Sequence, residues 1–237
     1  MKLVGIDGCR SGWIAVSLSD RCALLFERLS DMVAHYDDDT LFLIDMPIGL
    51  PCKMIYRDCE TDARKELSSQ RKSSVFPIPC REAVYAETYE MASRINRNVL
   101  QKGISKQTWF ICHKIKELDH LLLQDKKLRT RIKESHPELA FHYLNHRVSM
   151  EFNKKTEAGQ QERLLLLSQF SQNINVIYNN AIQKFKRMDV AKDDIIDALC
   201  LAVTLEEIIK HRISLESSNK DDRDLDMKIH VFDISAF

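Results

Sequence analysis

Glycine is scarce in this sequence, with only 6 among 237 residues, which excludes collagen-like and glycine-rich low-complexity chains. No stretch approaches the roughly 20 apolar residues that a membrane-spanning helix needs, so we expect no membrane partner. The seven cysteines include no C-x₂₋₄-C pair, which argues against a structural zinc site. Their odd number predicts free thiols in a reducing, cytoplasmic compartment. The first ten residues look like a strand carrying an acid, not like a signal peptide.

Several nucleotide-binding and catalytic motifs are also missing. No G-x-x-x-x-G-K-[ST] or G-x-G-x-x-G run occurs, which disfavours a P-loop or a Rossmann cofactor site. Ser73 and Ser74 lack the G-x-S-x-G elbow of a serine hydrolase. His142 and His146 lie four residues apart but outside an H-E-x-x-H motif, so we expect surface or capping roles for them.

Apolar residues make up 44% of the chain and charged residues 30%, an ordinary globular composition. The net charge is zero, yet it is −4 over residues 1–52, +5 over 53–114, +5 over 115–187 and −6 over 188–237. Nucleic-acid enzymes that use metals combine basic surfaces with clustered carboxylates. A patchwork of solvated faces would give the same asymmetry, so the pattern gains weight only if the acidic ends meet in space.

The order of the predicted elements indicates a mixed α/β fold. Three short apolar runs separated by tight turns, at about 3–9, 13–19 and 22–29, predict an antiparallel meander. A helix over about 30–37 leads to an apolar run at 41–47, which suits a central strand placed beside the first one. Further along, the patterns predict a strand at 131–135, helices at about 157–171, 174–187 and 192–213, a polar linker at 215–226 and an edge strand at 228–235.

Three groups of acids lie where a charged side chain is costly or crowded. Asp7 ends the first predicted strand and Asp45 ends the fourth, and a charge there needs solvent, a partner or a metal. Asp193, Asp194 and Asp197 precede the apolar body of the last helix, where their like charges repel on one face. The helix dipole relieves part of that repulsion, and a divalent cation would relieve more.

Six motifs occur in a fixed order from residue 2 to about 210, and together they resemble domain-of-unknown-function family 429, predicted nucleases with an RNase H-like fold related to Holliday-junction resolvases. The motifs are VGIDGCRSGW, LIDMPIGLP, RDCETDAR at 57–64, SSVFPIPCR at 73–81, ESHPE at 134–138 and KDDIIDALCLA. One departure is Ser11, where the family carries glycine or alanine. The resemblance implies one RNase H-like domain over 1–237, with a mixed five-stranded central sheet, helices on both faces and a mainly helical insertion at about 51–130.

The resemblance also implies the chemistry of the site. Asp7, Asp45, Asp194 and Asp197 fall on the metal-binding positions of the related resolvases, and Glu134 matches the acid before H-P-E, so these five residues are the expected catalytic set. Two Mg²⁺ or Mn²⁺ ions roughly 3.5–4 Å apart, bridged by Asp7, would drive hydrolysis of phosphodiester bonds in DNA or RNA. The expected phosphate-binding residues in the matched motifs are Arg10, Arg57, Arg64, Arg71, Lys72 and Arg81.

Two other functions remain open at this point. A non-catalytic nucleic-acid-binding or regulatory module could keep the same scaffold, although a scaffold alone needs none of the acids. A nucleotide phosphotransferase of the actin and sugar-kinase type would also use an Asp-Gly strand end, but such proteins usually carry two copies of the fold. The sequence leaves the choice between DNA and RNA, the choice of metal and the oligomeric state open, with a homodimer among the alternatives.

Overall fold

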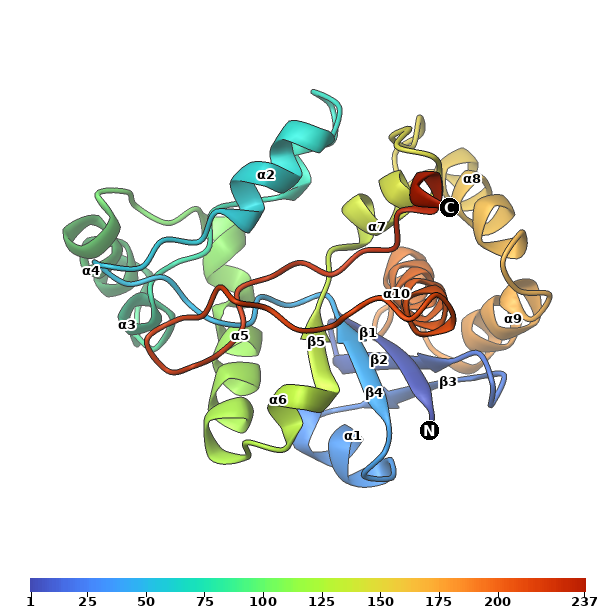
Figure 1. Ribbon diagram of the computed structural model, residues 1–237, viewed down its shortest axis with the longest axis horizontal. Helices are drawn as coiled ribbons and strands as arrows, with labels where there is room; N and C mark the ends of the chain where they lie inside the picture. Colours follow the sequence, from blue (N-terminus) through green and yellow to red (C-terminus); the bar gives the residue numbers. More distant parts are fainter. The chain divides into compact units, whose positions relative to one another are not determined.

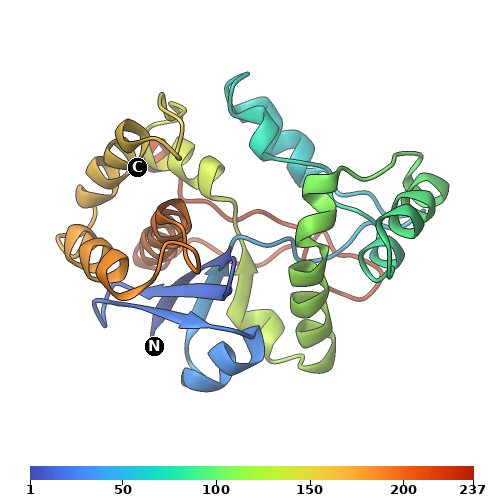
Figure 2. The ribbon, with the colours of Figure 1, turned by 180° about the vertical axis from the view of Figure 1, so that it is seen from behind.

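The computed structural model describes all residues from Met1 to Phe237, and they form two compact units. Unit 1 consists of Met1–Asp45, Arg131–Leu215 and His230–Phe237, and unit 2 consists of Met46–Thr130 and Glu216–Ile229. Unit 2 therefore contains the segment expected as an insertion, together with a second stretch close to the C-terminus. We describe each unit by itself, and Figures 1 and 2 show the path of the chain through them from two sides.

Unit 1 contains a mixed five-stranded sheet, which confirms the α/β class. Its strand order is β3-β2-β1-β4-β5, and its strands are β1 (Leu3–Cys9), β2 (Gly12–Ser17), β3 (Cys22–Phe26), β4 (Leu41–Ile44) and β5 (Ile132–Glu134). The first three strands pair antiparallel as predicted, whereas β4 lies parallel to β1 and β5 parallel to β4. The expectation that the fourth strand lies beside the first is confirmed.

A two-residue turn joins β1 to β2. Cys9 pairs with Gly12, whose φ of +132° is one that side-chain-bearing residues rarely adopt, and a Cβ there would lie 2.1 Å from the Phe26 carbonyl oxygen. Ser11, the departure from the family pattern, donates its hydroxyl proton to the Asp189 carboxylate at 2.9 Å. Ser11 therefore adds a hydrogen bond between this turn and the segment just before the last helix.

Helices cover both faces of the sheet in unit 1. The long helix α10 contacts β1, β2 and β4, and its core includes Ile14, Val16 and Leu43 (Figure 1). On the other face, Tyr36 directly follows α1, and its ring meets that of Phe42 with centroids 5.6 Å apart. The helices of this unit are α1 (Leu29–His35), α7 (Pro137–Leu144), α8 (Glu157–Ser168), α9 (Ile174–Lys184), α10 (Lys192–Lys210) and the 3₁₀ turn η2 (Ile234–Ala236), and α6 (Leu128–Arg131) spans the chain boundary between the units.

Gly5 sets how closely α10 approaches the sheet. A Cβ added at Gly5 would lie 2.2 Å from both the Ala198 carbonyl oxygen and the Ala202 amide nitrogen. The helix backbone therefore rests directly on the strand, which only glycine on β1 and small residues on α10 permit. Because Asp7 lies two residues after Gly5, and Asp197 immediately precedes Ala198, this contact also fixes the distance between two of the acids.

Unit 2 is mainly helical, with a small core of its own. Cys80, Ala83, Ala92 and Ile104 are buried in it, and the half-buried Trp109 packs against them. Thr88 and Ser105 cap two of its helices by accepting from main-chain N–H groups. The elements are α2 (Cys59–Glu66), the 3₁₀ turn η1 (Lys72–Ser74), α3 (Arg81–Val84), α4 (Tyr89–Leu100) and α5 (Lys106–Gln124). None of the chain's helices combines the length and apolar character that crossing a membrane requires.

Two sequence expectations near the C-terminus are wrong. The segment 215–226 is not merely a linker, because Asp221 is buried and its carboxylate accepts from the backbone N–H groups of Leu50 and Leu225, each at 2.9 Å. Residues 228–235 do not form an edge strand. The His230 N–H donates to the Glu134 carbonyl at 2.9 Å, and the Ser135 hydroxyl donates to the His230 carbonyl at 2.6 Å, but a side-chain bond replaces the ladder that a strand would need.

The close contact at Gly5 leads to a prediction about stability. We expect Gly5→Ala to unfold unit 1 or to lower its melting temperature strongly, because a methyl group at 2.2 Å from helix backbone must push α10 away. The control is Gly103→Ala in unit 2, where the nearest atom is the end of the Ser93 side chain at 3.0 Å and can move aside. Thermal denaturation of both variants makes the measurement, and equal stability of the two would show that α10 does not need this close approach.

Candidate functional site

The two acids at strand ends lie side by side, as predicted. Asp7 is on β1 and Asp45 directly follows β4, and the Asp45 N–H donates to the Ile6 carbonyl at 2.9 Å, which continues the parallel ladder. The Gly8 N–H donates to Asp7 Oδ1 at 2.7 Å and orients that carboxylate. Because β1 and β4 are parallel neighbours, Asp7 and Asp45 lie next to each other at this end of the sheet.

The first turns of α10 bring two more acids to this edge. Asp194 accepts from the Ala191 N–H at 2.9 Å, which satisfies one of the free donors at the helix N-terminus. Asp197 lies three residues further on and is buried, with 1% of its surface exposed. The contact of Gly5 with Ala198 and Ala202 directs these carboxylates toward the end of β1.

Burial and mutual repulsion raise the pKa values of all four carboxylates. The pKa of Asp7 lies well above its usual value, first because of burial and then because Asp45, Asp197 and Asp194 are close. Burial likewise raises the pKa of Asp45, to which Asp197 adds, although the neighbouring His136 acts in the opposite direction. The four acids are therefore close enough to act on one another electrostatically.

Asp194, in the first turn of α10, is half-buried. Burial, together with Asp193 and Asp197, raises its pKa from 3.8 to about 6, although the bond from Ala191 acts in the opposite direction. For Asp197, burial raises the pKa and the nearby Lys154 opposes the rise. The cluster is therefore partly protonated in weakly acidic solution.

Lys154 is a member of this site that sequence reasoning missed. Its ammonium group donates to Asp197 Oδ2 at 2.5 Å, from the segment between α7 and α8. Asp197, Asp7 and Asp45 together raise the Lys154 pKa above its usual value, although burial opposes them. Nothing distinguishes this lysine in the sequence, since it is one of two adjacent lysines in a polar segment.

Glu138 and Arg163 form an ion pair beside the acid cluster, and the sequence did not predict it. Glu138 adds its negative charge to the field at Asp45 and Asp197, and its carboxylate accepts from the Arg163 guanidinium at 2.6 Å. Arg163 is completely buried and also donates to the Phe152 carbonyl at 3.1 Å. Glu138 is the single carboxylate in the mostly apolar helix PELAFHYL, and this pattern is the signal that would have identified it.

Glu134 lies on the other face of the sheet. It pairs with Ile44 across the parallel β4–β5 ladder, and Ile44 pairs with Ile6. Paired residues of parallel strands point to the same face, whereas Gly5, one residue from Ile6, faces α10. The structure therefore brings together Asp7, Asp45, Asp194 and Asp197 but points Glu134 away from the α10 face.

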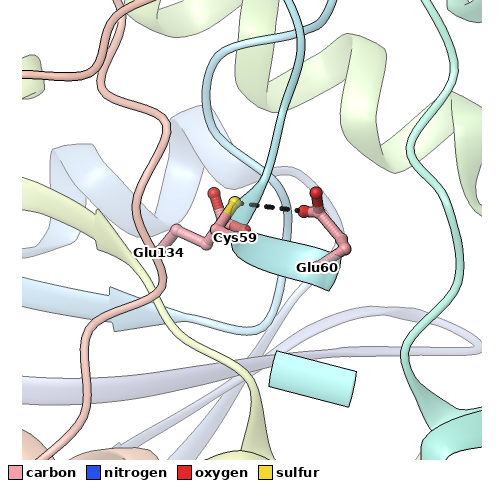
Figure 3. Close-up of side chains that lie close together, drawn as sticks. All are labelled: Cys59, Glu60 and Glu134. Carbon is pink, nitrogen blue, oxygen red and sulfur yellow. Dashed lines mark hydrogen bonds between the residues drawn. The ribbon is translucent and has the colours of Figure 1, made fainter. Parts of the chain in front are cut away.

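Arg57 and Arg81, two of the expected phosphate-binding residues, make ion pairs inside unit 2. Arg57 donates to Glu60 at 2.6 Å and to the Gly49 carbonyl at 2.6 Å, and its side chain is 2% exposed. Figure 3 shows Glu60 beside Cys59, whose sulfhydryl donates to it at 3.5 Å, with Glu134 of unit 1 also drawn. Arg81 bonds to Asp119 at 3.0 Å and also to Asp221 and Asp222.

The remaining basic residues lie at or near the surface. Arg10 is exposed in the β1–β2 turn of unit 1. In unit 2, Arg64 donates to the Val75 carbonyl at 2.5 Å, and Arg71 and Lys72 lie at the start of η1. Arg10 is the one expected phosphate ligand that belongs to the same unit as the acid cluster.

The donor type of the four acids suits a hard divalent cation. Asp7, Asp45, Asp194 and Asp197 offer carboxylate oxygens, which Mg²⁺ and Mn²⁺ prefer over nitrogen and sulfur. In addition, a positive group already sits among them, since the Lys154 ammonium is bonded to Asp197. A cation of either kind lowers the repulsion that raises the pKa values of the acids.

Comparison with known proteins identifies the family. The family model described as "Protein of unknown function (DUF429)" matches residues 5–216. Because the match covers most of the chain, the chain belongs to this family, which confirms the resemblance seen in the motifs. Nothing matches among curated proteins, and no solved structure matches either.

The raised pKa of Asp194 makes a prediction about stability and pH. Between its usual pKa of 3.8 and the folded value of about 6, the folded protein binds more protons than the unfolded chain. The free energy of unfolding of the metal-free protein should therefore fall as the pH rises through this window and stay low above it. Asp194→Asn keeps the acceptor for Ala191 and removes the charge, so it should be more stable by about 1–2 kcal/mol at pH 7–8.

Denaturant unfolding in a chelator, from pH 4 to pH 8, measures this effect. Asp62→Asn serves as the control, because Asp62 is an exposed first-turn acid of α2 and its loss should leave the pH profile unchanged. If Asp194→Asn is less stable than the wild type at pH 8, the Asp194 carboxylate is a structural group and not part of a repulsive cluster.

Proposed function

We propose that this chain is a divalent-metal-dependent nuclease, hydrolysing phosphodiester bonds of DNA or RNA on an RNase H-like scaffold, with a cytoplasmic location as part of the same proposal. The observation that carries the proposal is the meeting of Asp7, Asp45, Asp194 and Asp197 at one edge of the sheet, from two strand ends and one helix start. A scaffold without chemistry would gain stability by losing these charges, because burying like charges together is costly.

The sheet order supports the RNase H-like part of the proposal. The order β3-β2-β1-β4-β5 combines an antiparallel meander with two parallel strands; Asp7 lies in the last part of β1 and Asp45 directly follows β4, on the two neighbouring strands beside β2 and β5. Ligands of open α/β sheets usually bind near the carboxyl ends of the strands, and both acids lie toward that end.

The four aspartates would hold Mg²⁺ or Mn²⁺, which the donor set fits. When bound, the metal would supply charge to polarise the phosphoryl group and to generate a nucleophile from water. Hard cations bind oxygen donors, and four carboxylates supply more negative charge than one divalent ion neutralises. The cluster is therefore suited to more than one positive charge.

The chain's own residues fix the positions of these carboxylates. Gly8 holds Asp7 through its N–H, and Ala191 holds Asp194 in the same way. Asp197 is fixed by the ammonium group of Lys154 and by its burial between α10 and the sheet. Asp7 and Asp197 are nearly inaccessible to water, which strengthens every electrostatic interaction at their carboxylates.

Positive side chains would hold the phosphates of the nucleic acid. Arg10 is exposed in the turn that follows Asp7, and Arg64, Arg71 and Lys72 supply positive charge on unit 2. Arginine and lysine position a nucleic-acid backbone without reading its sequence. The expected substrate is therefore a phosphodiester, and the cleavage assay decides between DNA and RNA.

Asp7→Asn tests the catalytic part of the proposal. The asparagine keeps an acceptor for the Gly8 N–H and removes one of four repelling charges. We therefore expect a folded variant whose melting temperature equals or exceeds that of the wild type, together with loss of Mn²⁺-dependent cleavage by a factor of about 10² or more. The assay compares linear and branched DNA and RNA with and without Mn²⁺.

Asp62→Asn is again the control. It removes one exposed carboxylate of α2, outside the cluster, and should cleave like the wild type. Retained cleavage in Asp7→Asn would remove Asp7 from the mechanism. A wild type that binds nucleic acid but cleaves none of the substrates would favour the binding-module alternative, and phosphate transfer from a nucleotide would favour the phosphotransferase.

Salt dependence tests the class of substrate. If phosphates are held by several lysine and arginine side chains, the affinity for nucleic acid should fall about 10-fold or more between 50 and 200 mM salt, because bound counterions are released on binding. Fluorescence anisotropy with a labelled oligonucleotide in Ca²⁺ measures this, and a flat response would point to a small-molecule substrate.

A further inference from the structure

Lys154 occupies an unusual position for a lysine from a polar connecting segment. Its ammonium group bonds to Asp197 at 2.5 Å, and the Asp197 side chain is only 2% exposed. Asp7, Asp45 and Asp194 also interact electrostatically with the same ammonium group. One lysine is therefore bonded to Asp197 and acts with its charge on all four carboxylates.

The backbone around Lys154 is held firmly on α8. The Glu162 carboxylate accepts from the N–H groups of Glu151 at 2.7 Å and Phe152 at 3.0 Å, and the buried Arg163 donates to the Phe152 carbonyl at 3.1 Å. Gly159 allows the closest approach, since a Cβ there would lie 2.0 Å from the Asn153 carbonyl oxygen.

The C-terminal side of this segment is fixed as well. Thr156 caps α8 by accepting from the Gly159 N–H at 3.1 Å, and its own hydroxyl donates to the Asn153 carbonyl at 2.8 Å. The residues on both sides of Lys154 are thus attached to the helix. The position of the Lys154 Cα does not depend on its bond to Asp197.

The Lys154 side chain, in contrast, can leave the cluster. It is 35% exposed, so its four-carbon stem has a path to solvent while the head is bonded to Asp197. Rotation about the bonds of a lysine stem moves the ammonium group by several ångströms and needs no change in the backbone. A fixed attachment point with a mobile charged head is the arrangement that exchange of cations requires.

We propose that Lys154 is the internal cation of the acid cluster in the metal-free protein and that a divalent metal displaces its ammonium group from Asp197 on binding. This inference rests on the proposed metal-binding function of the same four carboxylates. Both cations neutralise the same repulsion, so they compete, and the lysine keeps the carboxylates assembled until the metal arrives.

Removal of the competing charge gives the first test. Lys154→Met keeps a long apolar stem and removes the cation, so the variant should bind Mn²⁺ about tenfold tighter than the wild type, which corresponds to a gain of ~1.4 kcal/mol. Its metal-free melting temperature should fall by several degrees, and saturating Mn²⁺ should restore it. Lys155→Met is the matched control, because Lys155 is the exposed neighbour and should change neither quantity.

The second test needs no variant of the site. In the wild type, the Lys154 amine is bonded to Asp197 and should react slowly with an acylating reagent such as acetic anhydride, as followed by peptide mass spectrometry. Mn²⁺ should increase its acetylation several-fold, whereas Lys155 should react at the same rate with and without Mn²⁺. This readout remains available if Lys154→Met does not fold.

The outcomes separate this inference from the proposed function. If the wild type binds Mn²⁺ but Lys154→Met binds it equally or more weakly, and acetylation of Lys154 does not respond to Mn²⁺, the exchange is overturned while the nuclease proposal stands. Conversely, exchange with Mn²⁺ in a protein that cleaves no nucleic acid would overturn the nuclease proposal alone. If neither the wild type nor Lys154→Met binds Mn²⁺ in isothermal titration calorimetry, both the cation exchange and the nuclease proposal are overturned.

Discussion

The close contact of α10 with β1 is the constraint on which the site depends. Gly5 lacks a side chain, and the helix backbone at Ala198 and Ala202 fills the space that one would occupy. Because Asp7 lies two residues after Gly5 on the strand and Asp197 precedes Ala198 on the helix, the two acids are placed near each other without any adjustable loop between them. A site held by two packed elements of regular structure keeps its geometry better than one held by connecting segments. Because the chain contains so few glycines, the presence of one at this helix–strand contact is informative.

The same contact creates an electrostatic problem that the rest of unit 1 partly solves. Four buried or half-buried carboxylates repel one another, and burial alone already raises their pKa values. Lys154 offsets part of this repulsion from one side, and Arg163 neutralises Glu138 just behind it. Complete neutralisation would favour the folded state, but it would also leave no affinity for a metal. The single lysine facing four acids leaves a negative site that is assembled yet still able to bind further positive charge.

The sequence predicts most of the sheet and the four aspartates, because these features are local. Alternating apolar runs and tight turns identify the meander, and an acid at the end of an apolar strand stands out wherever the strand goes. Lys154 could not be found in this way, since its role comes from a contact with Asp197, 43 residues away. Glu134 has the right motif, but the alternation of β5 turns it to the opposite face. The polarity of residues 215–226 resembles a linker because pattern alone does not show that Asp221 is buried and bonded to Arg81.

Unit 2 shows why a motif match does not by itself assign a role. RDCETDAR and SSVFPIPCR carry Arg57 and Arg81, which resemble phosphate-binding residues in the sequence. In the structure the Arg57 side chain is nearly buried and bonds to Glu60 and two carbonyl groups, and Arg81 joins α3 to α5 and to the segment around Asp221. Removing either guanidinium would leave buried carboxylates without their cation, a change that costs stability before it affects any ligand. Loss of activity in an Arg57 or Arg81 variant would therefore say little about phosphate binding, whereas Arg10, exposed and in the same unit as the acids, gives a test that folding does not confound.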